Sequence, residues 1–244
     1  SMQVLDLGLM VLSASEPVQS HTETLWRLGE NYRLPCFIFV TKMDLPNTGR
    51  EEIMKLLQNR LSGNCVDFGQ EREQLMEHIA LCGEGAMEEY LETGSVRDET
   101  VRELIRCRQL FPVFFGSGLK TQGVEELLKA LDSYAPEREY GEDFAARVYK
   151  IGSDSQGKRL TYMKITGGSL KVRSPIKYKD EKGNELEEKV SQIRLYSGIK
   201  YEAAEEVSAG QVCAVLGLSA CRRARRLGAD IALFPEMWSN GYQI

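Results

Sequence analysis

Length, composition and charge exclude several classes of protein at the outset. The chain has 244 residues, 42% hydrophobic and 27% charged, which suits one or two soluble domains with a substantial core. Because its net charge is −5, any contact with RNA would have to use a local patch of the surface. Its six scattered cysteines and two histidines disfavour a disulfide framework or a zinc site. No apolar run approaches the roughly 18 residues that cross a membrane, so we expect a cytoplasmic protein.

The first forty residues predict a strand–helix–strand unit. Residues 7–13 form a continuous apolar run of strand length, and residues 20–29 show helical spacing with Gly29 as the expected end of the helix. Residues 37–40 are aromatic and β-branched, as is typical of a strand buried on both faces. This order is that of a βαβ unit in a parallel sheet.

A polar cluster follows the second strand directly: Thr41, Lys42 and, after one residue, Asp44. Open α/β sheets place ligand sites at the carboxyl ends of their strands. A carboxylate there can accept hydrogen bonds from two adjacent N–H donors, such as N1–H and the N2 amino group of guanine, whereas adenine offers only one. The alternative interpretation is an ordinary strand end with a solvated lysine and a turn-forming aspartate.

The next segment, about residues 47–108, is predicted to be a helical insert. Charged and apolar residues alternate there at helical spacing, and we expect amphipathic helices that cover the sheet at the following positions: 51–61, 71–81, 86–91 and 98–107.

A third apolar strand is expected at residues 110–115, followed by a turn that begins Gly116-Ser117-Gly118-Leu119 and by a helix at 123–131. The arrangement of strand, short polar turn and helix therefore occurs twice. Two such strand ends side by side could close around one flat ligand, and a Ser-Gly turn leaves backbone N–H groups accessible.

The period of the hydrophobic pattern changes to two after a charged linker at 135–141. Residues 144–151 and 160–165 alternate, and short strands recur between glycine-containing turns as far as an apolar strand at 211–218. This pattern indicates an antiparallel barrel or sandwich.

Residues 152–159 match the phosphate-loop pattern G-x-x-x-x-G-K, but Arg159 stands where that loop needs a magnesium-binding Ser or Thr. An alternating strand also follows where a helix should begin, so we expect a hairpin loop. No G-x-G-x-x-G follows any predicted strand, which disfavours a dehydrogenase with an accessory barrel.

These features in this order resemble the elongation-factor-G-like translational GTPases. Residues 40–44 resemble the Asn/Thr-Lys-x-Asp guanine-specificity element, and residues 116–120 the Ser-Ala-Lys/Leu element that completes the base pocket. Residues 9–22 are similar to the strand and Val-Gln-x-x-Thr turn of translational GTPases, and residues 88–94 to a segment inserted in elongation factor G. The similarity is closest to the ribosomal-protection group, which includes the tetracycline-resistance proteins.

In the second half, residues 162–170 and 209–218 resemble the β-barrel second domain of that family. The resemblance implies a partial P-loop-GTPase-like parallel sheet with helices, followed by a translation-factor-type antiparallel β-barrel. The expected domains are the carboxyl-terminal part of a GTPase domain at 1–136, a barrel at 143–235, and a tail or the start of a further domain at 236–244.

The resemblance also implies roles for individual residues. Asp44 would bind guanine N1–H and N2, and Lys42 would pack over the base. Thr41 replaces the commoner Asn, so a hydrogen bond that tethers the base pocket to the phosphate loop would be weaker or absent.

The second loop would complete this pocket through Ser117, Gly118 and Leu119. Gly118 replaces the Ala of the family element, but the expected role is a backbone N–H donated to guanine O6, which glycine can supply.

The phosphate loop, first switch and Asp-x-Pro-Gly-His segment of this family would precede residue 2. The resemblance therefore implies a fragment with no catalytic or metal-binding residues, weak or no binding of GTP or GDP, and no hydrolysis. The parent protein would bind GTP with magnesium, hydrolyse it on the ribosome, and be a monomer; tetracycline protection is one role that the resemblance suggests.

A different class of function stays open, namely a non-enzymatic module that binds the ribosome or RNA. Its basis is the cluster Arg222-Arg223-Ala224-Arg225-Arg226, which suits phosphate contacts. The alternative is a solvated loop that balances an acidic surface.

Overall fold

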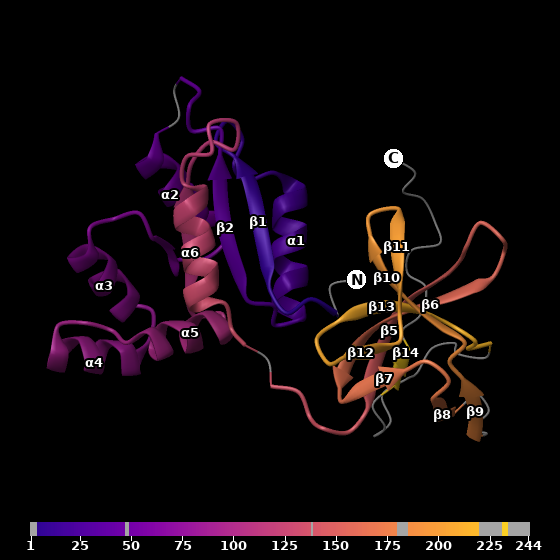
Figure 1. The fold of residues 1–244 in the computed structure, drawn as a ribbon. Coiled ribbons are helices and arrows are strands. Elements are labelled where there is room, and N and C mark those ends of the chain that lie inside the picture. The colour runs from indigo at the N-terminus through magenta and orange to yellow at the C-terminus, as the bar shows by residue number, and fades with distance from the viewer. Residues whose placement is uncertain (1–3, 47–48, 138, 180–184, 220–230, 234–244) are drawn as a thin grey trace. The chain divides into compact units, whose positions relative to one another are not determined.

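The structure, a computed structural model, describes residues 4–46, 49–137, 139–179, 185–219 and 231–233. It divides the chain after Glu137 into two compact units. We call described residues 4–137 the α/β unit and the described residues from 139 onward the β unit. The first combines a parallel sheet with helices, and the second is built from antiparallel strands with one parallel addition (Figure 1). The predicted fold class is therefore confirmed.

The sheet of the α/β unit is entirely parallel, in the order β1-β2-β4-β3. Its strands are β1 (Gly8–Ser13), β2 (Cys36–Thr41), β3 (Cys65–Asp67) and β4 (Phe111–Phe115). Three of these strands lie where the apolar runs predicted them. The fourth, β3, corrects the prediction of a purely helical insert, because this segment pairs with β4 and extends the sheet. Three residues are too few to show a hydrophobic period.

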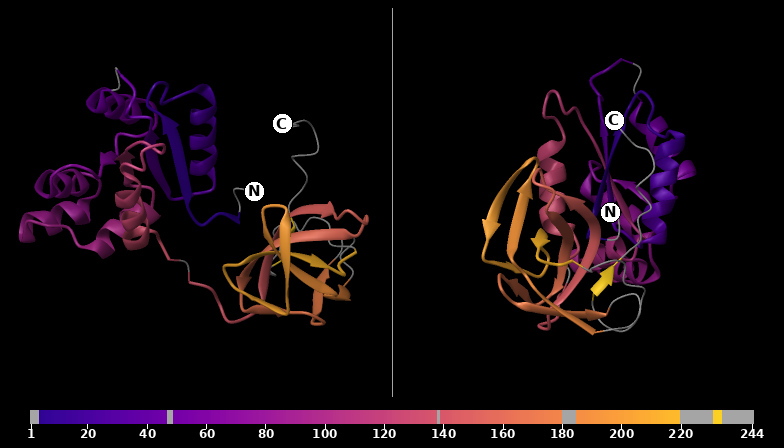
Figure 2. Two further views of the ribbon diagram at one scale, coloured as in Figure 1. Left: turned by 45° about the horizontal axis from the view of Figure 1, so that its top comes forward. Right: turned by 90° about the vertical axis from the view of Figure 1, so that its right-hand side faces the viewer.

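Strand β2 explains why the central strands lack alternation. Phe37 and Phe39 belong to a core cluster with residues of α5 (Asp98–Arg106) and α6 (Val124–Tyr134). Ile38 and Val40 belong to a second cluster with residues of α1 (Ser20–Asn31) and α2 (Arg50–Arg60). Helices thus cover both faces of the sheet, and Figure 2 shows α1 and α6 on opposite sides of it. A strand buried on both faces must be apolar at every position.

Two short helices, α3 (Arg72–Ala80) and α4 (Glu84–Thr93), complete the α/β unit and contribute to the same cluster as α5 and α6. The predicted helix positions in this unit are confirmed. The predicted end of α1 at Gly29 is wrong, because Gly29 is a buried residue inside the helix. The turn away from the helix falls at Arg33, whose backbone is left-handed with φ of 50°. None of the helices in the described residues is long and apolar enough to cross a membrane.

The β unit is a set of short strands whose buried residues form one large and one small apolar cluster. Its six-stranded sheet has the order β11-β10-β13-β6-β5-β14, and two pairs, β12-β7 and β8-β9, complete it. The strands are β5 (Ala145–Ser153), β6 (Arg159–Gly167), β7 (Ser169–Lys171), β8 (Pro175–Lys179), β9 (Glu185–Lys189), β10 (Gln192–Ser197), β11 (Lys200–Ala204), β12 (Glu206–Ser208), β13 (Val212–Leu216) and β14 (Ile231–Leu233). Buried residues from most of these strands form one cluster, which includes Ile165, Ile193 and Val215.

The β unit also corrects one expectation. Within the described residues, the last strand is β14 and not the apolar strand before it, since Ile231–Leu233 pairs in parallel with β5. Three predicted features lie outside the described residues: one of the expected glycine-containing turns, at 180–184, the arginine cluster at 222–226 and the tail at 236–244.

The cysteines of the described residues give a simple test of this packing. Cys36, Cys65, Cys82 and Cys213 are buried free thiols, and burial raises their pKa values to about 11 or 12, whereas Cys107 is exposed. Among these five cysteines we therefore expect a maleimide to label Cys107 first in the native protein, because the thiolate is the reactive form and needs access. Peptide mass mapping over time measures the order, and denaturant should make all five equivalent. Equal native labelling of Cys65 and Cys107 would contradict the packing.

Candidate functional site

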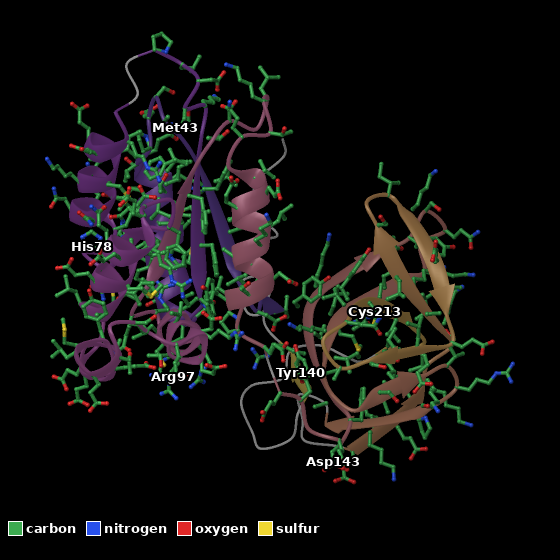
Figure 3. All side chains as sticks on the ribbon, turned by 60° about the vertical axis from the view of Figure 1, so that its left-hand side comes forward. Met43, His78, Arg97, Tyr140, Asp143 and Cys213 are labelled. Atoms are coloured by element: carbon green, nitrogen blue, oxygen red, sulfur yellow. The ribbon has the colours of Figure 1, made fainter. Side chains whose placement is uncertain are left out.

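The carboxyl ends of β2 and β4 lie side by side, because the two strands pair in parallel with Val40 opposite Phe115. Two backbone hydrogen bonds continue this pairing into the loops beyond. The Gly116 N–H donates to Val40 O at 2.9 Å, and the Met43 N–H donates to Gly116 O at 3.0 Å. Figure 3 labels Met43 in the loop that follows β2. The two predicted motifs therefore lie together at the carboxyl edge of the sheet, where α/β proteins place ligands.

The loop after β2 is held in a defined shape. Lys42 has a left-handed backbone with φ of 65°, and its carbonyl accepts a hydrogen bond from the Leu45 N–H at 3.2 Å. The Thr41 carbonyl accepts the Ala14 N–H at 2.9 Å, which ties this strand end to that of β1. A left-handed conformation is uncommon for a residue with a side chain and occurs often at functional sites. The side chains of Lys42 and Asp44 are exposed here.

The loop after β4 is closed by a pair of backbone hydrogen bonds between Ser117 and Gln122, at 3.0 and 3.1 Å. Ser117 is buried, and its hydroxyl accepts the Lys120 N–H at 3.3 Å. The same hydroxyl hydrogen-bonds to the Asp44 carboxylate and, with a smaller effect from the Lys120 charge, holds the pKa of Asp44 below its ordinary value. Asp44 therefore remains an ionised acceptor at neutral and mildly acidic pH.

One side chain bridges the two loops directly. The Gly118 N–H donates to Thr41 Oγ1 at 3.1 Å, although the residues are 77 positions apart in the chain. Leu119, at the tip of the same turn, is 90% exposed and is free to lie against a ligand. The structure thus brings Thr41, Lys42 and Asp44 together with Ser117 and Gly118. Their roles in base binding stay predictions.

Two structural requirements of this site were not predicted. Gly116 lies so close to the opposite side of its loop that an added Cβ would be 2.0 Å from Gln122 O. A glycine directly after a buried strand was the available signal. In addition, Arg50 holds Asp67 by two hydrogen bonds of 2.5 Å, and its guanidinium lies 4.9 Å from the centre of the Phe115 ring. This pair was missed because Asp67 ends the unpredicted strand β3.

The residues present fit a guanine base. The exposed Asp44 carboxylate, which is held ionised, matches the donors of that base, and the Gly118 N–H, which here donates to Thr41 Oγ1, matches its carbonyl acceptor. Among the residues that the structure describes, we see none that match a triphosphate and its magnesium. The near-match to a phosphate loop is the hairpin between β5 and β6, where Asp154 Oδ1 accepts the N–H groups of Gln156 and Lys158 at 2.9 Å. The prediction of a hairpin loop there is confirmed.

Comparison with known proteins agrees with this geometry. The family model described as "Elongation factor Tu GTP binding domain" matches residues 1–137, which include both loops of the site. The chain belongs to the elongation factor Tu GTP-binding-domain family. It is 27% identical to elongation factor G of Mycoplasma pneumoniae over 89% of the chain, and 27% identical to elongation factor G 2 of Desulfotalea psychrophila over 97% of the chain.

The similarity extends beyond the GTP-binding domain into the β unit. A crystal structure of a protein from Thermus thermophilus superposes with a TM-score of 0.73 over 96% of the chain at 22% identity, which shows a common fold. The chain spans 41% and 45% of the length of the two elongation factors and 43% of the crystallised chain. The chain therefore corresponds to less than half of the length of each of these three proteins.

Proposed function

We propose that this chain supplies the guanine-reading part of a translational GTPase that acts on the ribosome. One observation carries the proposal. In a member of the elongation factor Tu GTP-binding-domain family, the Asp44 carboxylate and the Gly118 N–H lie on two loops joined by hydrogen bonds at the sheet edge. The elongation factors that the chain resembles support the ribosome as the partner of the full-length protein.

The proposed recognition uses complementary hydrogen bonds. The two Asp44 oxygens accept N1–H and N2–H of guanine, and the Gly118 N–H donates to O6. Adenine has an unprotonated N1 and an amino group at position 6, so it can neither donate to Asp44 through N1 nor accept the Gly118 N–H. Covering the Asp44 carboxylate with a base that does not pair with it costs about 1–3 kcal/mol or more, which is enough to separate the two bases.

The flanking side chains would cover the base. Lys42 can lay its aliphatic stem over one face of the ring system while its ammonium group stays in water. Leu119 is 90% exposed, and contact with a base would remove apolar surface from water. Ser117 would act through Asp44, which it holds ionised.

Hydrolysis is not proposed for this chain alone. Its sequence contains no G-x-x-x-x-G-K-[ST], and magnesium with the phosphate groups supplies most of the affinity and chemistry in P-loop GTPases. We propose that the full-length protein is a cytoplasmic, monomeric GTP hydrolase that uses magnesium. Protection of the ribosome against tetracycline is the specific role that its sequence resemblance suggests.

Because base recognition is separate from the chemistry at the phosphate groups, we predict that the 244-residue chain does not turn over GTP. We expect phosphate release to equal that of a buffer blank, even with ribosomes present, because the base contacts do not activate water. A phosphate-release assay with an intact elongation factor as positive control measures this. Turnover above the blank, retained after repurification and lost in a variant of Asp44, would contradict the assignment.

The base-reading function itself is tested with nucleosides, which avoid the phosphates. Guanosine should shift the backbone amide resonances of residues 41–45 and 116–120 in a two-dimensional NMR titration, with an affinity in the millimolar range, and adenosine should not. Shifts of equal size for both nucleosides, or shifts confined to other parts of the chain, would refute the base pocket.

A second candidate function is a ribosome- or RNA-binding module without catalysis. The β unit has a row of tyrosines on four strands, with centroid distances from 5.5 to 6.3 Å: Tyr149, Tyr162, Tyr196 and Tyr201. Lys150 and Arg194 lie over two of these rings, at 5.3 and 4.3 Å. Aromatic and cationic groups together favour RNA. Ribosome binding that weakens with salt but is unchanged by variants of Asp44 would support this candidate instead.

A further inference from the structure

The Gly118 N–H, which the proposed function assigns to the base, already donates a hydrogen bond to Thr41 Oγ1. The bond is 3.1 Å long, and it lies at the protein surface, with Thr41 half-buried at the end of β2 and Gly118 exposed. A backbone amide has a single N–H. A base that binds here through a carbonyl oxygen must therefore displace the threonine hydroxyl or share the N–H with it.

The two loops do not need this bond to keep their positions. Three sets of backbone hydrogen bonds already hold them: Gly116 to Val40, Met43 to Gly116, and the mutual pair of Ser117 and Gln122, all between 2.9 and 3.1 Å. A single bond from a surface side chain adds little to such a set. Its main effect is on which acceptor the amide can bind.

The glycine itself leaves room for rearrangement. A Cβ added at Gly118 would lie 3.5 Å from Thr41 Oγ1, which is ordinary van der Waals contact, so the threonine side chain is not wedged against the turn. The backbone of Gly118 is not left-handed, so the turn does not depend on glycine there. The hydroxyl can leave the amide without a change in the backbone.

We propose that Thr41 determines affinity and specificity at this site, as an internal competitor for the Gly118 N–H. This inference rests on the proposed function, in which a guanine carbonyl binds that amide. The base exchanges one acceptor for another, and the released hydroxyl is solvated. The hydroxyl therefore weakens the binding of every base with a 6-oxo group, and it has no such effect on bases that lack this group.

The test is the isosteric variant Thr41→Val in the whole 244-residue chain, titrated with nucleosides by two-dimensional NMR. Valine keeps the β-branched shape and removes only the hydroxyl. We expect guanosine and inosine, both with a 6-oxo group, to bind about two- to tenfold more tightly, the range that one neutral hydrogen bond spans. Adenosine and 2-aminopurine riboside, which lack the group, should show no gain.

A matched control removes a hydroxyl elsewhere in the same unit. Thr24 on α1 is exposed, and its hydroxyl donates to the Ser20 carbonyl at 3.0 Å. Thr24→Val should leave the affinity for every nucleoside unchanged. In the absence of ligand, Thr41→Val should also speed exchange of the Gly118 amide hydrogen with solvent, since that amide loses its acceptor.

The outcomes separate the two proposals. If the wild type binds guanosine and Thr41→Val binds it with equal or lower affinity, the competitor role is overturned, whereas the base pocket is still supported. An equal gain for 2-aminopurine riboside also overturns it, because that gain would not depend on the 6-oxo group. No guanosine binding by either protein overturns the base pocket, and the competitor role with it.

Discussion

Replacement of Asp44 by asparagine is expected to move the base preference of the site from guanine towards xanthine. The asparagine side chain presents one oxygen and one NH2 group in place of two carboxylate oxygens. The NH2 group can donate to the 2-oxo group of xanthine, but it faces the N2 amino group of guanine as donor against donor. One unmatched polar group is worth about 1–3 kcal/mol, so the ratio of the two affinities should change by roughly five- to 150-fold.

Parallel NMR titrations of wild type and Asp44→Asn with guanosine and xanthosine measure this ratio. The same substitution in the full-length protein can be measured by competition between GTP and xanthosine triphosphate. Asp132 on α6 provides a matched control, because it is exposed and lies outside both loops. Asp132→Asn should leave the ratio unchanged. An Asp44→Asn protein with unaltered discrimination would show that Asp44 does not read the base.

Replacement of Gly116 by alanine is expected to destabilise the α/β unit and to abolish base binding. A Cβ at this position would lie 2.0 Å from Gln122 O and 3.0 Å from Phe39 Cζ. The first contact is with backbone that also accepts the Ser117 N–H, so the loop must open to relieve it. Overpacking of this kind costs about 1–3 kcal/mol, and the opened loop would no longer hold Ser117 against Asp44.

The free energy of unfolding from urea titration measures the stability effect, and the guanosine titration measures the loss of binding. Gly118→Ala is a matched control in the same turn, because its Cβ would lie at an ordinary distance of 3.5 Å from Thr41 Oγ1. It should change stability by less than about 0.5 kcal/mol, as is usual for surface substitutions. Equal free energies of unfolding for the two variants would contradict the close approach seen at Gly116.

Most helices and strands were predictable, because the burial of each element leaves a hydrophobic pattern in its own residues. Strand β2 is apolar at every position because helices pack on both of its faces, and that burial is visible in the sequence as an uninterrupted run. The helices show apolar residues at helical spacing for the same reason. Strand β3 was missed because three residues have no measurable period, and the end of α1 was misplaced because Gly29 is tolerated inside the helix.

The candidate site was also predictable only in part. Two polar segments directly after apolar strands indicated where a ligand would bind, and the structure places these segments on adjoining loops. The reason for glycine at position 116 was not visible in the sequence, because it depends on the close approach of the Gln122 backbone carbonyl, six residues away.

The sequence by itself determined the order of the helices and of three of the four strands in the α/β unit, the change from a parallel α/β unit to antiparallel strands, and the two motifs that resemble a guanine pocket. Each of these depends on side-chain periodicity or on neighbouring residues. The tertiary structure alone decided that β4 lies beside β2, and hence that Gly118 meets Thr41 across 77 positions of the chain. Strand order depends on packing between distant segments, which local patterns do not encode. The pairing of Thr41 with the Gly118 amide could therefore be recognised only in the folded protein.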